Sequence, residues 1–163
     1  MCVWPILFTA LYLLCQTEEI YPTPALLAGY GIELDWGAAI ALVYIAFYLV
    51  IEQPGVVGPL AAMMVAGALY GSNVLLSDTG GMIGPTTGLY WKQATGVHVF
   101  CWIAQFYGHF AHEGRSPALL DNLAQAFLFA PLFVLLEVFF ALFNYKPALQ
   151  RATEKLLKDK KLK

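Results

Sequence analysis

Long uncharged apolar runs restrict this chain more than any other feature of its sequence. Val56–Leu76 contains no charged residue, and Leu123–Phe143 is interrupted only by Gln125 and Glu137. A helix needs about 20 apolar residues to cross a bilayer, with roughly 17 as the lower limit. Both runs reach this length. Three further runs reach it when their flanking residues are counted: Met1–Cys15, Trp36–Ile51 and Ala94–Tyr107.

The overall composition agrees with a lipid environment. Hydrophobic residues make up 60% of the chain and charged residues 12%, whereas a soluble domain is about half apolar and about a quarter charged. We therefore predict an all-α fold, a polytopic transmembrane helix bundle with about five apolar segments. The alternative is a soluble helical protein with buried helices. The first run begins at Met1 without a polar flank, so its helix is expected to be truncated.

Basic residues mark the end of the chain. Six of the nine Lys and Arg residues lie in the last thirteen positions, and none precedes Lys92. This pattern predicts a transmembrane helical domain over 1–145 and a basic C-terminal tail over 146–163, with the tail in the cytosol. The three cysteines lie in apolar runs without paired spacing, which favours small buried hydrophobes over a disulfide framework. No nucleic-acid partner is expected, and the oligomeric state is left open.

A polar segment, "QFYGHFAHEGRSPALLDN" at 105–122, separates the last two apolar runs. On a helix continuing from Ala94 to Glu113, one arc of about 100° would carry all its histidines, one acid and one amide. These residues are His98, Gln105, His109, His112 and Glu113. Because unpaired polar groups in hydrocarbon are costly, this stripe should face the bundle interior or water.

Each residue of the stripe has a plainer alternative. His109 is the strongest candidate metal ligand, because Glu113 lies one helical turn away. His98 is a weak candidate ligand that also fits a hydrogen-bonded packing residue, and His112 fits an interfacial histidine. Gln105 fits a hydrogen bond between helices.

The following segment adds further polar candidates. Ser116 and Pro117 predict a helix start, placing Asp121 and Asn122 in its first turns. Glu137 lies deep in the last apolar run. A carboxyl group in this position predicts either a functional role or a polar partner on a neighbouring helix.

These residues carry a resemblance to a known family. The stretch "WIAQFYGHFAHEGRSPALLDNLAQAFLFAPLFVLLEVFFAL" resembles the signature of a membrane-protein family of fungi, plants and bacteria, long described as a domain of unknown function. Its best-understood fungal members are iron(II)-dependent dioxygenases. They shorten 2-hydroxy fatty acids by one carbon during phytosphingosine breakdown at the endoplasmic reticulum. Residues 1–93 resemble the family only in their hydrophobic layout and in Pro5.

The resemblance implies a multi-pass membrane protein of the endoplasmic reticulum that uses Fe(2+), O2 and a long-chain 2-hydroxy fatty acid. It implies His109 as the metal ligand, with Glu113 and Asp121 as catalytic carboxylates that ligate the metal or support it. Arg115 could pair with the substrate carboxylate. The other residues assigned to second-shell or substrate contacts are Gln105, Asn122 and Glu137.

Two departures from the family pattern shape these expectations. The family usually carries an apolar aromatic at the position of His112, which is therefore unsupported as a ligand. The family also has histidines in an amino-terminal segment that would fall upstream of Met1. The chain as written is expected to be a shortened gene model, a degenerate paralogue, or an enzyme with other ligands. The remaining alternatives are a non-catalytic structural or regulatory membrane protein of the same fold and a small transporter component.

Overall fold

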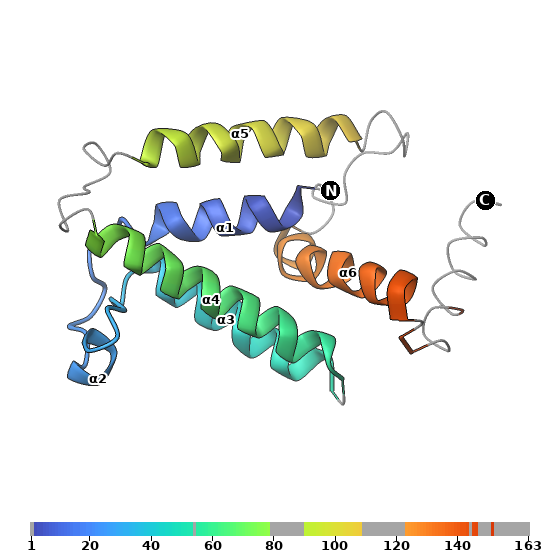
Figure 1. Ribbon diagram of the computed structural model, residues 1–163, viewed down its shortest axis with the longest axis horizontal. Coiled ribbons are helices and arrows are strands. Elements are labelled where there is room, and N and C mark those ends of the chain that lie inside the picture. The colour runs from blue at the N-terminus through green and yellow to red at the C-terminus, as the bar shows by residue number, and fades with distance from the viewer. Residues whose placement is uncertain are drawn as a thin grey trace.

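The computed structural model describes residues 2–53, 55–78, 90–108, 123–143, 145, 146 and 151; the side chains of 77, 78 and 123–126 are not described. All regular structure within these residues is helical, and Figure 1 shows the arrangement of the helices. The helices are α1 (Val3–Leu14), α2 (Ala25–Ala28), α3 (Trp36–Ile51), α4 (Val57–Asp78), α5 (Trp91–Gly108) and α6 (Leu123–Phe143).

Each expected apolar run forms one helix, and α2 is an additional short turn of helix between the first two runs. The start of α3 shows why its boundary is sharp. Asp35, only 1% exposed, accepts a hydrogen bond from the Ala38 backbone N–H at 2.7 Å. An aspartate at this position satisfies one of the backbone donors that a helix start leaves free.

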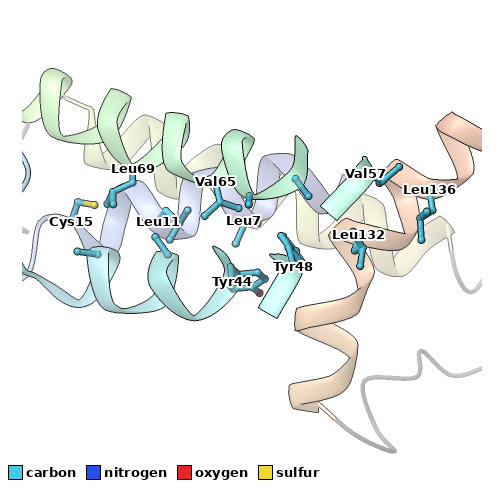
Figure 2. Close-up of a cluster of buried hydrophobic side chains, with 14 residues drawn as sticks. Leu7, Leu11, Cys15, Tyr44, Tyr48, Val57, Val65, Leu69, Leu132 and Leu136 are labelled. Carbon is cyan, nitrogen blue, oxygen red and sulfur yellow. The ribbon is translucent and has the colours of Figure 1, made fainter. Parts of the chain in front are cut away.

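Helices α3 and α4 form an adjacent pair joined by a short connection. Helix α1 packs against both of them and also against α5, while α6 packs mainly on α4 (Figure 1). Figure 2 shows the core between these helices, in which Leu11, Tyr48 and Val65 are fully buried. Leu132 and Leu136 bring α6 into the same core.

Among the described helices, the segment Val57–Leu76 of α4 is the one both long enough and apolar enough to cross a membrane. Three further apolar helices are shorter: Val3–Leu14, Trp36–Ile51 and Phe127–Phe143. The all-helical class is therefore confirmed for the described residues. A bundle that crosses the membrane several times stays a prediction.

Candidate functional site

The polar stripe of α5 faces α1 where the structure describes it. His98 contacts Thr9 of α1 through Nδ1, with Nδ1 and Oγ1 2.9 Å apart. The indole N–H of Trp102, one turn further along α5, donates to His98 Nε2 at 3.0 Å. Both ring nitrogens of His98 are therefore occupied by hydrogen bonds to protein groups.

The hydrogen bonds also define the tautomer of this histidine. Trp102 can only donate, so Nε2 of His98 must be the accepting nitrogen. The proton of the neutral ring then lies on Nδ1 and points to Thr9 Oγ1. The Thr9 hydroxyl in turn donates to the Pro5 carbonyl at 2.7 Å. A single directed chain of hydrogen bonds thus runs from α5 to the backbone of α1.

Gln105 makes the second polar link between the same two helices. Its side-chain Oε1 accepts a hydrogen bond from the backbone N–H of Cys2 at 3.0 Å. Cys2 is the N-cap of α1 and has no side-chain cap of its own. Gln105 therefore satisfies a donor at the start of α1, which agrees with the helix-to-helix hydrogen bond expected for it.

Aromatic side chains connect this face of α5 to α6. The ring of Trp102 stacks on Phe106, with centroids 5.4 Å apart, and meets Phe127 of α6 edge-on at 5.6 Å. Such pairs add about 0.5–1.5 kcal/mol beyond the burial of their area. Trp102 therefore serves two interfaces at once, through its N–H and through its ring.

The remaining residues of the candidate site lie outside the described part of the chain. Residues 109–122 connect the end of α5 to the start of α6, and their positions are not described. The roles assigned to the site residues within this segment stay predictions. They are His109, His112, Glu113, Arg115, Asp121 and Asn122.

The role expected of Glu137, either functional or paired with a polar group on a neighbouring helix, stays a prediction. Its side chain is exposed on α6. Its neighbour Leu136 is the residue that points into the core. The reason is the register of α6: the side that carries Leu132 and Leu136 packs on α4, and Glu137 is turned about 100° from Leu136.

The described residues do not form a metal site. In the described part of the chain, no three His, Cys, Asp or Glu side chains lie close enough together to hold a metal ion. His98 has no ring nitrogen left for a metal in this arrangement. Any iron site held by three such side chains must therefore include at least one ligand from residues beyond those described.

A second polar cluster lies at the connection between α3 and α4. Glu52, 7% exposed, accepts hydrogen bonds from Lys146 Nζ at 2.6 Å and from the Tyr145 hydroxyl at 2.9 Å. Its other carboxylate oxygen accepts from the Gly58 backbone N–H at 2.7 Å. The Tyr145 hydroxyl also accepts from the Val56 N–H at 2.9 Å. We call these residues the Glu52 cluster.

The Glu52 cluster shifts the pKa of both of its charged groups. Burial by itself would raise the pKa of Glu52, but the hydrogen bonds from Lys146, Gly58 and Tyr145 outweigh it and hold this pKa below its usual range. The hydrogen bond to Glu52 raises the pKa of Lys146. Both groups are therefore held in their charged forms.

Two glycines make room for the carboxylate. A Cβ on Gly55 would collide with the carboxylate oxygens of Glu52. A Cβ on Gly58 would collide with the Tyr48 carbonyl oxygen and lie 2.9 Å from the Glu52 Cβ. The sequence offers a partial signal for this site, since "EQPG" combines an acid with a glycine, but nothing local indicates its partners.

The described residues thus form an all-helical bundle. Neutral hydrogen bonds join α1 to α5, and an ion pair lies at the end of α3. Comparison with known proteins gives the family. The family model described as "2-hydroxy-palmitic acid dioxygenase Mpo1-like" matches residues 1–142. The protein described as 2-hydroxy-palmitic acid dioxygenase MPO1 of Saccharomyces cerevisiae is 32% identical over 117 residues. That match covers 72% of this chain and 60% of the yeast protein.

The chain therefore belongs to the 2-hydroxy-palmitic acid dioxygenase Mpo1-like family. This confirms the resemblance drawn from the stretch around His109. No solved structure matches this chain.

Proposed function

We propose that this protein is an iron(II)-dependent dioxygenase that shortens long-chain 2-hydroxy fatty acids by one carbon, with O2 as co-substrate. The observation that carries the proposal is the match to the family model over residues 1–142, which includes the whole polar segment 105–122. The chemical character of that segment supports it. Imidazole and carboxylate are the ligands that non-haem iron(II) uses for oxygen activation.

His109 is proposed as the imidazole ligand, with Glu113 and Asp121 as the carboxylates that bind or support the metal. Arg115 is a candidate partner for the substrate carboxylate, and Asn122 and Glu137 are candidate supporting groups. Gln105 has a described role, since it caps α1. Through this contact it connects the carboxyl-terminal part of α5 to the amino end of α1.

The assay uses membranes that contain the full chain, supplied with 2-hydroxypalmitic acid and O2, and measures the product that is one carbon shorter. Metal analysis of the purified protein reports bound iron. His109→Ala is expected to remove both product and iron. Gln53→Ala is the matched control, because Gln53 is exposed just beyond the end of α3 and its hydrogen bond within the described part of the chain goes to the Leu49 carbonyl.

The outcomes separate two failures. Product formation by His109→Ala at the wild-type rate would overturn the site assignment and leave the reaction in place. Wild-type protein that binds no iron and forms no product would make this chain a non-catalytic member of its family.

We further propose that the protein is an integral, multi-pass protein of the endoplasmic reticulum membrane with a cytosolic C-terminus. Large apolar side chains support this, since Val50, Phe100 and Leu142 are 71%, 68% and 70% exposed on three different helices. Soluble proteins rarely expose so much apolar surface. Alkaline carbonate should leave the protein in the membrane pellet, and protease added to intact microsomes should remove a C-terminal tag. Release into the supernatant would contradict the proposal.

A further inference from the structure

Two cysteines meet where α1 lies beside α5 (Figure 1). Cys2 is the residue before the first turn of α1, and Cys101 lies within α5. Their side chains are close enough for the two thiol groups to interact directly. Both are free thiols in this structure. The packing of the two helices therefore brings together two oxidisable groups that are far apart in the sequence.

The register of α5 against α1 holds this pair in place independently of the thiols. Gln105 accepts a hydrogen bond from the Cys2 backbone N–H at 3.0 Å. Cys101 precedes Gln105 by one turn and is turned from it by about 40° around α5, so both residues lie on the same face. The side chain of Cys101 is 6% exposed, as a position against a neighbouring helix requires. The backbone contact of Cys2 thus places it beside the face of α5 that carries Cys101.

The difference in exposure gives the two thiols different roles. Cys2 is partly exposed, whereas Cys101 is buried. A small oxidant from solution therefore reaches the Cys2 sulfur first. A thiol oxidised by a peroxide becomes a sulfenic acid, which condenses with an adjacent thiol to form a disulfide. Cys101 is the adjacent thiol.

We propose that Cys2 and Cys101 form a disulfide in the presence of hydrogen peroxide and that this bond fastens α1 to α5. The Cys2 sulfur attacks one peroxide oxygen, the O–O bond breaks, and Cys2 becomes a sulfenic acid as one water molecule leaves. The Cys101 sulfur then attacks the Cys2 sulfur, the S–S bond forms, and the S–O bond breaks with release of a second water molecule. The two thiols lose two electrons in total, and the peroxide gains them.

The position of Cys2 favours this step. Because Cys2 lies outside the helical turns of α1, its side chain can turn toward Cys101 without disturbing the helix. The bond adds a covalent link beside the hydrogen bond of Gln105, so it fixes the amino end of α1 on the carboxyl-terminal part of α5. The proposal uses no residue of the segment 109–122 and does not depend on the proposed reaction.

The test counts thiols before and after oxidation. The purified full chain is reduced in detergent, treated with hydrogen peroxide, unfolded and labelled with a maleimide. Mass spectrometry should find three labels on the reduced protein, one for each cysteine, and on the oxidised protein a single label at Cys15. Digestion of the oxidised protein should yield one peptide pair joined through Cys2 and Cys101, which dithiothreitol separates. The oxidised protein should also unfold about 5–10 °C higher than the reduced protein.

Three variants locate the reaction. Cys101→Ser should stop at the sulfenic acid of Cys2, which a cyclic diketone traps, and should show no rise in unfolding temperature. Cys2→Ser should leave Cys101 reduced, because the buried thiol has lost its exposed partner. Cys15→Ala is the matched control, because Cys15 lies at the other end of α1, where its sulfur is 4.0 Å from Asn73 Nδ2. The bond between Cys2 and Cys101 should form in this variant as in the wild type.

Wild-type protein that still takes up three labels, or that accumulates a sulfenic acid without forming the bond, would overturn the proposal. A bond that includes Cys15, or one that joins two copies of the chain, would overturn the pairing. An unfolding temperature that is the same with and without the bond would contradict the fastening of α1 to α5.

Discussion

Two regions of this molecule bury polar groups by opposite means. In the Glu52 cluster a carboxylate and an ammonium group form an ion pair at 2.6 Å, with a tyrosine hydroxyl and a backbone N–H completing the shell of the carboxylate. The interface of α1 with α5 contains no charge in its described hydrogen bonds. It relies on Thr9, neutral His98 and Trp102.

The difference follows from position along the helices. The Glu52 cluster lies where α3 ends and α4 has yet to begin, and the side chain of Lys146 is 33% exposed. Because this helix end is partly exposed, the free-energy cost of desolvating full charges is smaller there. The α1–α5 contacts lie within the helices, where an unpaired charge would be much more costly. Neutral donors and acceptors therefore have a lower desolvation cost inside the bundle. At its ends, where this cost is smaller, charged groups give the stronger hydrogen bonds.

The largest effect on stability is expected from Glu52→Ala. This change removes the acceptor of three donors and leaves the buried Gly58 N–H unsatisfied, so the free energy of unfolding should fall by about 3 kcal/mol. Thermal or denaturant unfolding in detergent measures it. Gln53→Ala, the exposed neighbour, should change stability by less than about 0.5 kcal/mol. Equal effects of the two changes would mean that the cluster contributes nothing.

A smaller loss is expected from Gly58→Ala, which keeps every charge and changes only the space around them. The added methyl group collides with the Tyr48 carbonyl oxygen, which is backbone and cannot move freely. The expected cost is about 2 kcal/mol. Gly67→Ala is the control, since its Cβ meets open space and alanine should stabilise the helix by up to about 1 kcal/mol. A gain in stability at both positions would contradict the crowding at Gly58.

The neutral interface should be less sensitive than the charged one. His98→Ala should cost about 2 kcal/mol, because it removes two hydrogen bonds between side chains. Thr9→Val should cost about 1 kcal/mol, because it removes one of these bonds, while the bond of its hydroxyl to the Pro5 carbonyl of its own helix adds little stability. The double variant should cost little more than His98→Ala alone, because both changes remove the same contact. Unfolding measurements on all three variants complete the cycle, and strictly additive losses would show that the two side chains act independently.

The smallest effect is the dependence of stability on pH. The folded pKa of Glu52 is lowered, so its contribution is fully present above the unfolded value of about 4.3 and is lost as the pH falls through the folded pKa. The folded pKa of Lys146 is raised, so its contribution is present below about 10.4 and is lost as the pH rises through the folded pKa. The stability difference between wild type and Glu52→Gln should therefore shrink on acidification from pH 7, by about 1 kcal/mol at most. A constant difference would contradict the ion pair.

The helices of this fold are largely predictable from the sequence, and the cluster at their end is not. The runs Trp36–Ile51 and Leu123–Phe143 coincide with α3 and α6, because charge, proline and glycine mark their boundaries. Glu52 and Lys146 lie 94 positions apart in the chain. No local pattern relates them, since the contact exists only once α6 has packed near the start of α4.

The candidate site shows a similar division. Helical periodicity placed His98 and Gln105 on one face of α5, and both side chains do contact α1. The same reasoning did not identify Thr9 as a partner of His98, because it considered each helix alone. It also passed over Trp102, although the i,i+4 spacing places this residue beside His98 on the same helix. The side chain of Glu137 is exposed because the register of α6 places its neighbour Leu136 in the core, and depth within an apolar run does not reveal this register. The orientation of a helix about its own axis depends on its neighbours.

The pairing of α1 with α5 has a consequence for how the chain folds. Helices α3 and α4 meet across a few residues, so their contacts close a short loop and form at little entropic cost. Thr9 reaches His98 across 89 positions, and Cys2 reaches Gln105 across 103. Helix α1 therefore waits for a partner that is synthesised much later, while α3 and α4 are already available to cover its apolar side. We therefore expect the polar face of α5 to assemble on α1 late in folding, after the core has formed.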